Sequence, residues 1–407
     1  MNPLLKTNFE ACTKCAICTE YCPVSEAWPP FLGPKQSGPD GERQRLKDAS
    51  FYDEVLKYCT NCKRCEVACP SSVRVGDVIA LAREKYARGS FSPRNAILSH
   101  TDFVGSLATM AAPLVNFGAN LKIVKFFLEK VLKIPAWRTF PSYSQGTFRN
   151  WFFDKGPSQK AFARRLSFFH GCFINYNNPS LGRDAVRLIN ALGLGVDLLE
   201  SERCCGVPLV SSGFFKDAAA NAAVNDQSIQ KALLGAERVV VASSTCCMTL
   251  RDEYPDVLKL NNENWRKKVD LLPRYIYRLL EEGLSLKFKP TPMTVAYHTA
   301  CHMEKLGWSA YSIELLKLIP ELKIVLLPSS CCGVAGTYGF KLENSQISQK
   351  IGAPLFAEIA KSGADLVVTE CETCKLQIEM SASVPCENPL TVLARALDDG
   401  SGGDASP

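Results

Sequence analysis

The sequence predicts a mixed fold, α+β overall with α/β repeats, in which a helical N-terminal domain precedes two copies of an α/β module. One cysteine spacing occurs twice between residues 12 and 70, which indicates a small domain organised around its thiols. From Leu166 onward, several motifs recur at offsets of 127 to 129 residues. In each copy, Val-, Ile- and Leu-rich segments alternate with amphipathic ones, a pattern typical of a mostly parallel sheet covered on both faces.

The two cysteine runs are Cys12-x-x-Cys15-x-x-Cys18-x-x-x-Cys22-Pro23 and Cys59-x-x-Cys62-x-x-Cys65-x-x-x-Cys69-Pro70. This spacing is typical of two-cluster ferredoxins, in which the fourth cysteine of each run binds the cluster of the other run. We therefore expect two [4Fe–4S] clusters. The expected ligands are Cys12, Cys15, Cys18 and Cys69 for the first cluster, and Cys22, Cys59, Cys62 and Cys65 for the second. A zinc site or a redox dithiol would explain one C-x-x-C pair, but not two complete runs.

The composition is that of a soluble protein of two or three domains, with 407 residues, 46% of them apolar and 22% charged. A net charge of +6 argues against a dedicated nucleic-acid binder and permits contact with an anionic membrane or an acidic partner. Since no apolar run precedes Cys12, we expect the 19 cysteines to lie in a reducing cytosol. Neither a G-x-G-x-x-G motif nor a P-loop occurs, so we expect no flavin or NAD, and no residue pattern indicates a catalytic site.

Between the two cysteine runs, Pro and Gly predict an irregular stretch over Pro29–Pro39. Asp40 is then expected to cap a helix, with the charged cluster from Glu42 to Asp48 on its solvent face. The expected core side of this helix is Leu46, Ala49, Val55, Leu56 and Tyr58. A further helix is predicted over Val75–Tyr86, with Val78, Ile79, Leu81 and Ala82 as its core side.

Residues 101–165 form a region that connects this domain to the repeats. The uncharged stretch from Phe103 to Leu121 is long enough to span a bilayer, but Ser, Thr, Pro, Asn and Gly dilute it, so no spanning helix is expected. Lys122–Ile134 is apolar with interleaved lysines. We expect it to be a packed helix, and the alternative is a helix in the membrane interface. Pro135–Arg165 is expected to be a linker that wraps a neighbouring surface.

The repeats begin at Leu166. Phe169-His170-Gly171-Cys172 is matched by Tyr297-His298-Thr299-Ala300-Cys301, Cys204-Cys205-Gly206-Val207 by Cys331-Cys332-Gly333-Val334, and Thr245-Cys246 by Thr373-Cys374. The expected domains are therefore residues 1–100, 101–165, 166–290 and 291–397, with a disordered tail at 398–407. Expected strands include 196–199, 239–242, 324–327 and 366–369, and expected helices 184–192, 216–234 and 309–319. The cysteines follow strands, where such sheets bind ligands.

The repeated cysteines are candidates for a further iron–sulfur site. The second module supplies five, Cys301, Cys331, Cys332, Cys371 and Cys374. Adjacent cysteines bridge each other poorly, so Cys331-Cys332 before Gly333 suits two ligands of one inorganic centre. The first module supplies Cys172, Cys204, Cys205 and Cys246, but Ser243 stands opposite Cys371, and Cys247 is an extra neighbour. A first-module site that has lost its metal, leaving buried cysteines, is an open alternative.

The histidines are expected mainly to be structural. His170, His298 and His302 flank the first cysteine of each module, where they could hydrogen-bond a cluster sulfur or carry a proton. Bonding to the backbone is the expected case. His100 has no motif around it.

With these motifs in this order, the chain resembles the CCG family of iron–sulfur subunits, which includes subunits of glycolate oxidase, heterodisulfide reductase and anaerobic glycerol-3-phosphate dehydrogenase. The stretches that carry the likeness are Gly33–Arg43, Tyr58–Pro70, Phe169–Phe173, Cys301–Lys305 and Thr337–Lys341. They are most similar to those of the glycerol-3-phosphate dehydrogenase group. In heterodisulfide reductase relatives, a full C…CCG…CxxC set holds a noncubane [4Fe–4S] cluster, which the second module resembles.

The resemblance implies an electron-transfer subunit without substrate chemistry of its own. Flavin-containing partner subunits would oxidise sn-glycerol 3-phosphate, and this chain would pass the electrons toward menaquinone as a peripheral protein on the cytoplasmic face of the inner membrane. Alternatives are a glycolate or lactate oxidase subunit, a catalytic subunit of the heterodisulfide reductase type, and an anchoring module whose CCG cysteines bind nothing.

Overall fold

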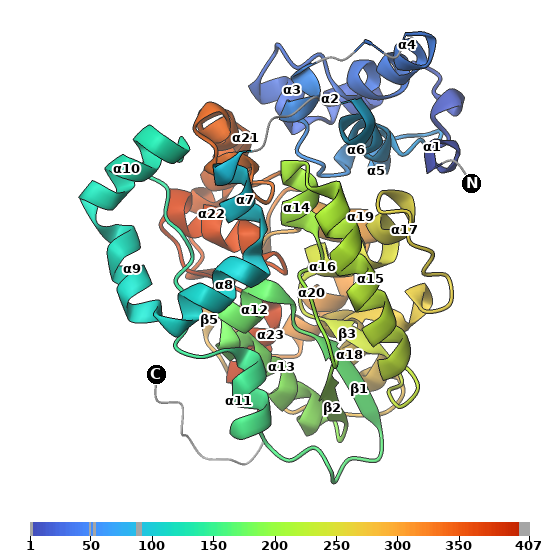
Figure 1. Ribbon diagram of the computed structural model, residues 1–407. Coiled ribbons are helices and arrows are strands. Elements are labelled where there is room, and N and C mark those ends of the chain that lie inside the picture. The colour runs from blue at the N-terminus through green and yellow to red at the C-terminus, as the bar shows by residue number, and fades with distance from the viewer. Residues whose placement is uncertain (1–2, 49, 52–53, 87–91, 399–407) are drawn as a thin grey trace.

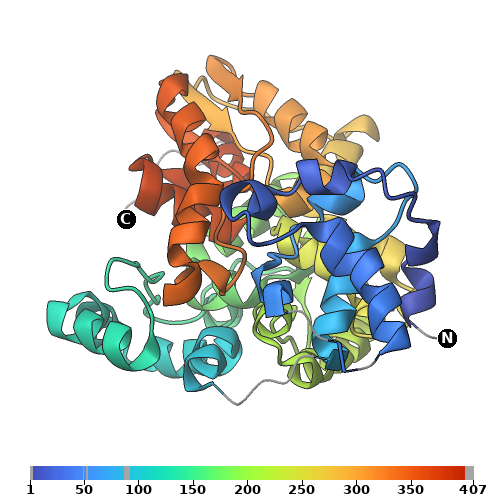
Figure 2. The ribbon, with the colours of Figure 1, turned by 90° about the horizontal axis from the view of Figure 1, so that it is seen from above.

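The computed structural model describes residues 3–48, 50–51, 54–86 and 92–398. It consists of an N-terminal helical domain, an arm of helices and two α/β modules (Figure 1). From above, the N-terminal domain in blue lies over the modules and the arm in teal projects to one side (Figure 2). The part of the predicted disordered tail from residue 399 to 407 lies outside the described residues.

The regular structure described in the N-terminal domain is helical. Its elements are α1 (Pro3–Lys6), η1 (Phe9–Ala11), α2 (Ile17–Glu20), α3 (Pro23–Ala27), η2 (Gln36–Asp40), α4 (Gly41–Lys47), η3 (Glu54–Tyr58), α5 (Arg64–Val67) and α6 (Val75–Tyr86). Helix α6 begins and ends as predicted. Its expected core residues Val78, Ile79, Leu81 and Ala82 are buried.

The insertion between the cysteine runs departs from the prediction in its backbone. The stretch expected to be irregular ends in the helical turn η2, which contains Pro39. Asp40 is not an N-cap, because its own backbone is helical and its carboxylate instead accepts a bond from Arg43 at 3.0 Å. The helix does not continue to Tyr58: α4 ends at Lys47, Leu46 is 55% exposed, and Ala49 lies outside the described residues.

The charged cluster at residues 42–48 is not simply a solvent face. Arg45 is 1% exposed and Glu42 is 3% exposed. Arg45 donates to the Glu42 carboxylate at 2.7 Å and to the Ser37 carbonyl at 3.0 Å, so this pair holds η2 against α4. A run of charged residues in the sequence predicts a surface location. Arg45 and Glu42 are buried instead, because each has an oppositely charged partner three residues away.

The arm comprises α7 (Pro93–Ser99), α8 (Thr101–Met110), α9 (Ala112–Asn120) and α10 (Lys122–Leu132). The expectation that residues 122–134 form an ordinary packed helix is met only in part, because Ile134 is buried and α10 contacts α9, but no residue within α10 itself is buried. Ile123, Phe126, Phe127 and Val131 are each more than half exposed. None of the helices in the described ranges is both long and apolar enough to cross a bilayer.

Residues 135–165 are not only a linker. Helix α11 (Phe148–Asp154) forms within them, capped by the Thr147 side chain, which accepts from the Asn150 N–H. Phe148 is fully buried against Gly182 of the first module, where a β-carbon would meet the phenyl ring at 2.4 Å. Because Gly182 has no side chain, the Phe148 ring can pack against it and hold this segment on the first module.

The two modules have the same topology. In the first, β1 (Arg165–Phe169), β2 (Gly195–Leu198), β3 (Val239–Val241) and β4 (Val269–Leu271) form a parallel sheet in the order β2-β1-β3-β4. In the second, β5 (Met293–Tyr297), β6 (Leu322–Leu326), β7 (Leu366–Val368) and β8 (Cys386–Glu387) form one in the order β6-β5-β7-β8. The predicted α/β repeat is confirmed.

Helices cover both faces of each sheet. In the first module they are α12 (Gly171–Tyr176), α13 (Pro179–Ala191), α14 (Val207–Ser212), α15 (Phe215–Ala232), α16 (Ser244–Met248), η4 (Thr249–Glu253), α17 (Tyr254–Asp256), η5 (Arg266–Lys268) and α18 (Leu272–Glu281). In the second they are α19 (Cys301–Leu306), α20 (Ser309–Lys317), η6 (Tyr338–Phe340), α21 (Leu342–Ser362), α22 (Glu372–Ala382) and α23 (Pro389–Ala396).

The modules pack against each other with matching helices. Helix α13 of the first contacts α23 of the second, and α20 of the second contacts α18 of the first. Alternate strand residues face two apolar cores, Phe169 and Val241 one of them and Phe168 and Val240 the other. Both cores contain residues of both modules, so the repeats share their interior and hold the carboxyl ends of the two sheets in fixed relation.

Candidate iron–sulfur sites

The two cysteine runs adopt the same local backbone. In each run, the residue before the second cysteine and the residue after it have left-handed conformations: Lys14 and Ala16 in the first run, with φ of 60° and 64°, and Asn61 and Lys63 in the second, with φ of 55° and 64°. The short helices α2 and α5 then follow at matching positions. The repeated cysteine spacing is therefore matched by a repeated backbone geometry.

The structure brings the eight cysteines together in two groups of four, each made of the first three cysteines of one run and the fourth cysteine of the other. Burial raises the pKa of Cys18, and negative charge on Cys12, Cys69 and Cys15 raises it further. Burial likewise raises the pKa of Cys65, with Glu66, Cys62, Cys59 and Cys22 adding to the effect. Each group has the membership expected of one ligand set, and the binding of a cluster by each group stays a prediction.

These groups fit an iron–sulfur cube by the chemistry of their donors. Each consists only of thiols, the ligands such clusters use. The Val73 N–H donates to Cys69 Sγ at 3.3 Å, a backbone bond of the kind that tunes cluster sulfurs. In the described part of the chain, no three His, Cys, Asp or Glu side chains are arranged to hold a single metal ion.

A buried cation beside the second group was missed by sequence reasoning. Lys63 is 2% exposed, and its Nζ lies 2.5 Å from Asp77, 3.4 Å from Glu253 and 3.8 Å from Glu66. Burial lowers the pKa of Lys63, but the three carboxylates outweigh it and hold the pKa well above its usual value. Because Glu253 belongs to the first module, this ion cluster fixes the N-terminal domain on the repeats.

The second group lies beside the cysteines of the second module. The thiolate of Cys331 is among the charges that raise the pKa of Cys62, after burial itself. Cys22 and Cys331 also share one small apolar cluster with Tyr338, Ile347 and Ile351. The N-terminal thiols and the repeat thiols are therefore neighbours, although more than 260 residues separate Cys62 from Cys331 in the chain.

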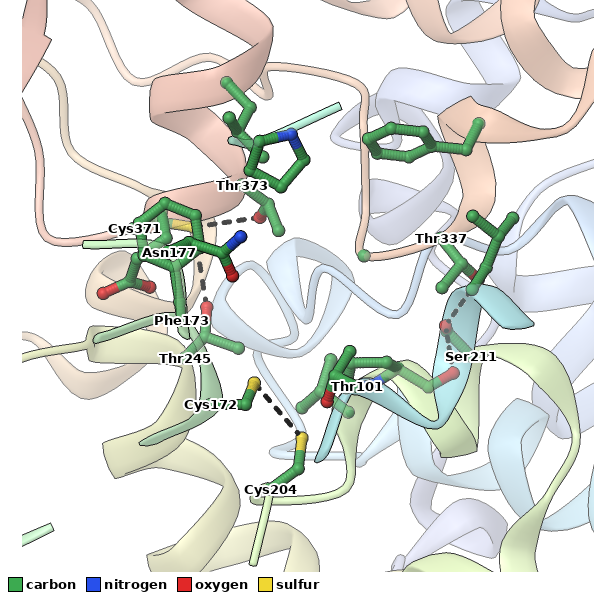
Figure 3. A pocket seen from close by; sticks show the side chains of 18 of the residues that line it. Thr101, Cys172, Phe173, Asn177, Cys204, Ser211, Thr245, Thr337, Cys371 and Thr373 are labelled. Carbon is green, nitrogen blue, oxygen red and sulfur yellow. Dashed lines mark hydrogen bonds between the residues drawn. The ribbon is translucent and has the colours of Figure 1, made fainter. Parts of the chain in front are cut away.

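All nine repeat cysteines proposed from the sequence line one cavity of about 510 Å³ between the ends of the two sheets and the arm. They are Cys172, Cys204, Cys205 and Cys246 of the first module and Cys301, Cys331, Cys332, Cys371 and Cys374 of the second. In Figure 3, the thiols of Cys172 and Cys204 face each other across 3.6 Å, and Cys371 lies near Thr245 and Thr373. Cys247 is fully buried in the apolar core and does not line the cavity, so it does not replace the missing thiol.

The paired cysteines behave alike in the two modules. Bonds donated by neighbouring thiols hold the pKa of Cys204 and of Cys331 well below the usual value. The second cysteine of each pair, Cys205 or Cys332, has a raised pKa because its thiol donates a hydrogen bond to the first cysteine, and burial and the negative charge of neighbouring thiols raise the pKa further. In the second module, the Gly333 N–H donates to Cys331 Sγ at 3.4 Å, which the left-handed φ of 87° at Gly333 permits.

The second module also buries a cation without a counter-charge. Arg138 is 2% exposed, and no described carboxylate pairs with it. Its guanidinium donates to Gln377 and, at 3.1 Å, to Ser348, while its Nε has no partner. Burial lowers the pKa of Arg138 to about 10, and the nearby Cys332 opposes this. A buried cation of this kind suits an anionic cluster on the adjacent thiols.

The histidines differ from one another. His170 Nδ1 lies 3.0 Å from the Gly171 carbonyl, the expected backbone contact, and 3.1 Å from the Glu202 carboxylate, whereas its buried Nε2 has no partner. His302 lies 3.2 Å from both Thr245 Oγ1 and the Asn61 carbonyl. His298 is fully buried and neither ring nitrogen has a partner, which the expected backbone bonding does not explain; burial lowers its pKa to about 4. His100 contacts Asp217 at 3.2 Å.

Comparisons with known proteins agree with this arrangement. Residues 8–73 match the family described as a 4Fe-4S dicluster domain, and residues 166–251 and 295–379 match the cysteine-rich domain family named CCG. A subunit of the anaerobic glycerol-3-phosphate dehydrogenase of Escherichia coli K12 is 55% identical over 96% of this chain and 99% of its own length. A subunit of the fumarate reductase (CoM/CoB) of Methanothermobacter marburgensis is 26% identical over 95% of this chain and 72% of its own. Lactate utilization protein A of Geobacillus kaustophilus is 30% identical over 53% of this chain and 90% of its own length.

Proposed function

Because this chain belongs to a family of anaerobic glycerol-3-phosphate dehydrogenase subunits, with its dicluster and cysteine-rich domains, we propose that it is the electron-transfer subunit of such a dehydrogenase. The observation that carries the proposal is the succession of thiol groups: two sets of four in the N-terminal domain, then a set of five beside them. Sites in such a row suit the transport of electrons rather than the conversion of a substrate.

Three clusters are proposed. Cys12, Cys15, Cys18 and Cys69 hold one cube, and Cys22, Cys59, Cys62 and Cys65 hold the other. Cys301, Cys331, Cys332, Cys371 and Cys374 hold a further, noncubane cluster. Bound clusters of this type supply one-electron carriers whose potentials depend on charge and burial. The chain contributes the thiols, the bonds from the Val73 and Gly333 N–H groups, and the Arg138 charge.

The proposed partners follow from the family. Flavin-containing subunits oxidise sn-glycerol 3-phosphate and release two electrons and two protons, and menaquinone accepts the electrons at the inner membrane. This chain carries no sequence motif for a flavin or nucleotide of its own. The dehydrogenase chemistry is therefore assigned to the partner subunits.

The arm supports a peripheral position on the cytoplasmic face of the membrane. Its outward residues are apolar and exposed, among them Phe103 at 66%, Met110 at 83%, Leu114 at 76% and Phe127 at 61%. Lys122, Lys130 and Lys133, in and directly after α10, are exposed too, and exposed apolar side chains with nearby lysines are suited to contact with anionic headgroups. Phe127→Asp is expected to abolish flotation with anionic vesicles while leaving the iron content unchanged.

The decisive experiment uses the full chain purified without oxygen. We expect about eight iron and eight sulfide atoms per chain from two cubes and about four of each from the further cluster. Reduced protein should give electron paramagnetic resonance signals of iron–sulfur type. Zinc in place of iron, or no such signal, would overturn the proposal. Isolation of the complex from its source then identifies the flavin subunits, and turnover with glycerol 3-phosphate rather than glycolate or lactate tests the substrate.

A further inference from the structure

We propose that the cavity beneath the arm is the binding site of an isoprenoid quinone, which takes its electrons there. The inference rests on the proposed electron-transfer function, and it adds the location of the quinone site and the residues that line it. Nothing in the paired cysteine motifs points to such a site. It follows from what the structure places around the cavity.

The cavity is lined by side chains of two kinds. The cysteines of both modules, with Thr245, His302 and Thr373, are polar. The arm and the segment that follows it contribute mainly apolar side chains, among them Val104, Val115, Ala119, Leu128 and Phe140, beside the amides of Asn116 and Asn120. The whole cavity of about 510 Å³ includes the space beside the five thiols proposed to hold a cluster, and it lies within the range of pockets that enclose small organic ligands. A matching ligand has a polar end, which faces the thiols, and an apolar remainder.

The helices above the cavity carry apolar side chains toward solvent as well as toward the cavity. Val115 and Ala119 of α9 line the cavity beside Asn116 and Asn120, whereas Leu114 and Phe117 of the same helix are 76% and 68% exposed. In α10, Val124 lines the cavity and Ile123 is 63% exposed. A surface helix of a soluble domain normally has one apolar stripe. The second apolar face is explained if the arm lies on lipid and an apolar ligand passes from the lipid to the cavity.

These observations select the ligand class. The ligand must dissolve in lipid, because of the apolar route, and must accept electrons, because its polar end lies against thiol groups that suit redox clusters. Quinone carbonyls accept hydrogen bonds, and the hydroxyls of Thr245 and Thr373 and the His302 ring line the cavity beside the cysteines. The net reaction is the reduction of the quinone to a quinol by two electrons from the dehydrogenase partner's substrate and two protons, which ultimately come from solvent.

Binding is tested on the anaerobically purified full chain with a naphthoquinone that carries two isoprene units, by equilibrium dialysis. Ala119→Trp fills the part of the cavity beside the apolar side chains, and we expect its dissociation constant for this probe to rise at least tenfold. Leu114→Trp, on the outer face of the same helix, is the matched control and should leave the constant unchanged. Equal affinity in all three proteins would overturn the inference.

A second measurement avoids dependence on the folding of a variant. An azido-naphthoquinone irradiated with the unaltered chain should label peptides from residues 97–143 or around Phe340, and labelling confined to other regions would overturn the inference. A fatty acid that displaces the probe with equal affinity would show a general lipid site and would also overturn it. Iron–sulfur signals are recorded on the same samples: their absence contradicts the proposed function, whereas intact signals without quinone binding contradict only this site.

Discussion

The two modules share one fold, yet their cysteine sets differ at a single matched position. Ser243 and Cys371 both precede the helix that follows the third strand of their module, with φ of −95° and −130°. The Ser243 hydroxyl accepts from the Cys246 N–H and donates to Glu372 of the other module at 2.7 Å. The Cys371 side chain caps nothing and lies against Thr245 and Thr373. In the first module this position stabilises structure, and in the second it offers a thiol.

The electrostatic surroundings differ as well. In the first module, the Asp102 carboxylate accepts from the Cys204 N–H at 2.7 Å, and Glu202 accepts from the Gly171 N–H at 2.6 Å. Burial raises the pKa of Asp102 to about 7 and that of Glu202 to about 8. Glu370 and Glu372 have raised pKa values of about 7 beside the second set, but Arg138 is close to that set too. The two modules therefore keep the same fold, and differences at single side chains determine which module is better suited to an anionic cluster.

The largest expected difference concerns iron. Cys332→Ala should remove the second-module cluster, a loss of about four iron atoms per chain, because it deletes one of the adjacent ligands. Cys205→Ala, the matched change in the first module, should leave the iron content unchanged. Iron and sulfide analysis of both variants checks this. Equal losses would mean that both modules hold clusters and would break the comparison.

The ion cluster that joins the first module to the N-terminal domain is expected to contribute strongly to stability. Lys63→Met leaves Asp77 and Glu253 buried without their cation and Glu66 with Lys305 alone, which should cost about 3–5 kcal/mol of unfolding free energy. Thermal unfolding measures the loss. Lys57→Met, at a side chain that is 53% exposed, should cost about 0.5 kcal/mol. A similar small effect at Lys63 would contradict the structural role of Glu253.

Arg138 distinguishes the second module by charge. Arg138→Gln should make the reduction potential of its cluster about 60 mV more negative, a tenfold change for one electron, because the cation favours the reduced form. Redox titration followed by electron paramagnetic resonance measures the shift. Arg149, which donates to the carbonyls of Leu199 and Glu200, provides the control, and Arg149→Gln should leave that potential unchanged.

Ser243→Cys is designed to abolish the difference between the modules. It restores the missing thiol and should raise the iron content, while the lost cap and the lost bond to Glu372 cost about 1 kcal/mol. Ser243→Ala is the matched control, with the same loss of stability and no added iron. If Ser243→Cys gains no iron, the thiol is not the only feature that the first module lacks.

The smallest expected effect lies at the interface between the modules and depends on pH. Burial raises the pKa of Asp184 on α13 to about 6, against a bond from Thr391 that lowers it. A folded-state pKa above the unfolded value means that stability is full below pH 4 and falls as the pH rises through 6. Asp184→Asn should therefore raise the unfolding free energy by about 1 kcal/mol at pH 8 and leave it unchanged at pH 4. Denaturant titrations at the two pH values test this, and an equal effect at both would contradict the raised pKa.

The sequence by itself determined the features that depend on spacing. The cysteine runs, the repeated strands and helix α6 each arise from residues near one another in the chain, and their periodicity is visible without a structure. Prediction failed where a neighbour outside the pattern intervened. Arg45 and Glu42 were predicted to be surface charges but are buried against each other, and α10 was predicted to be a packed helix although none of its residues is buried.

Only the tertiary structure decided how the sites relate. It brought nine repeat cysteines into the wall of one cavity and set Cys62 of the N-terminal domain beside Cys331. It also joined Arg138 to Gln377, 239 residues away, and Lys63 to Glu253. Such contacts have no signature in the local sequence, because they depend on which surfaces remain uncovered once each module has folded. They also depend on burial, since a charged side chain in the interior is stable only where a partner lies beside it. Spacing therefore specifies the candidate ligands, and packing specifies their neighbours, their charge and the route between them.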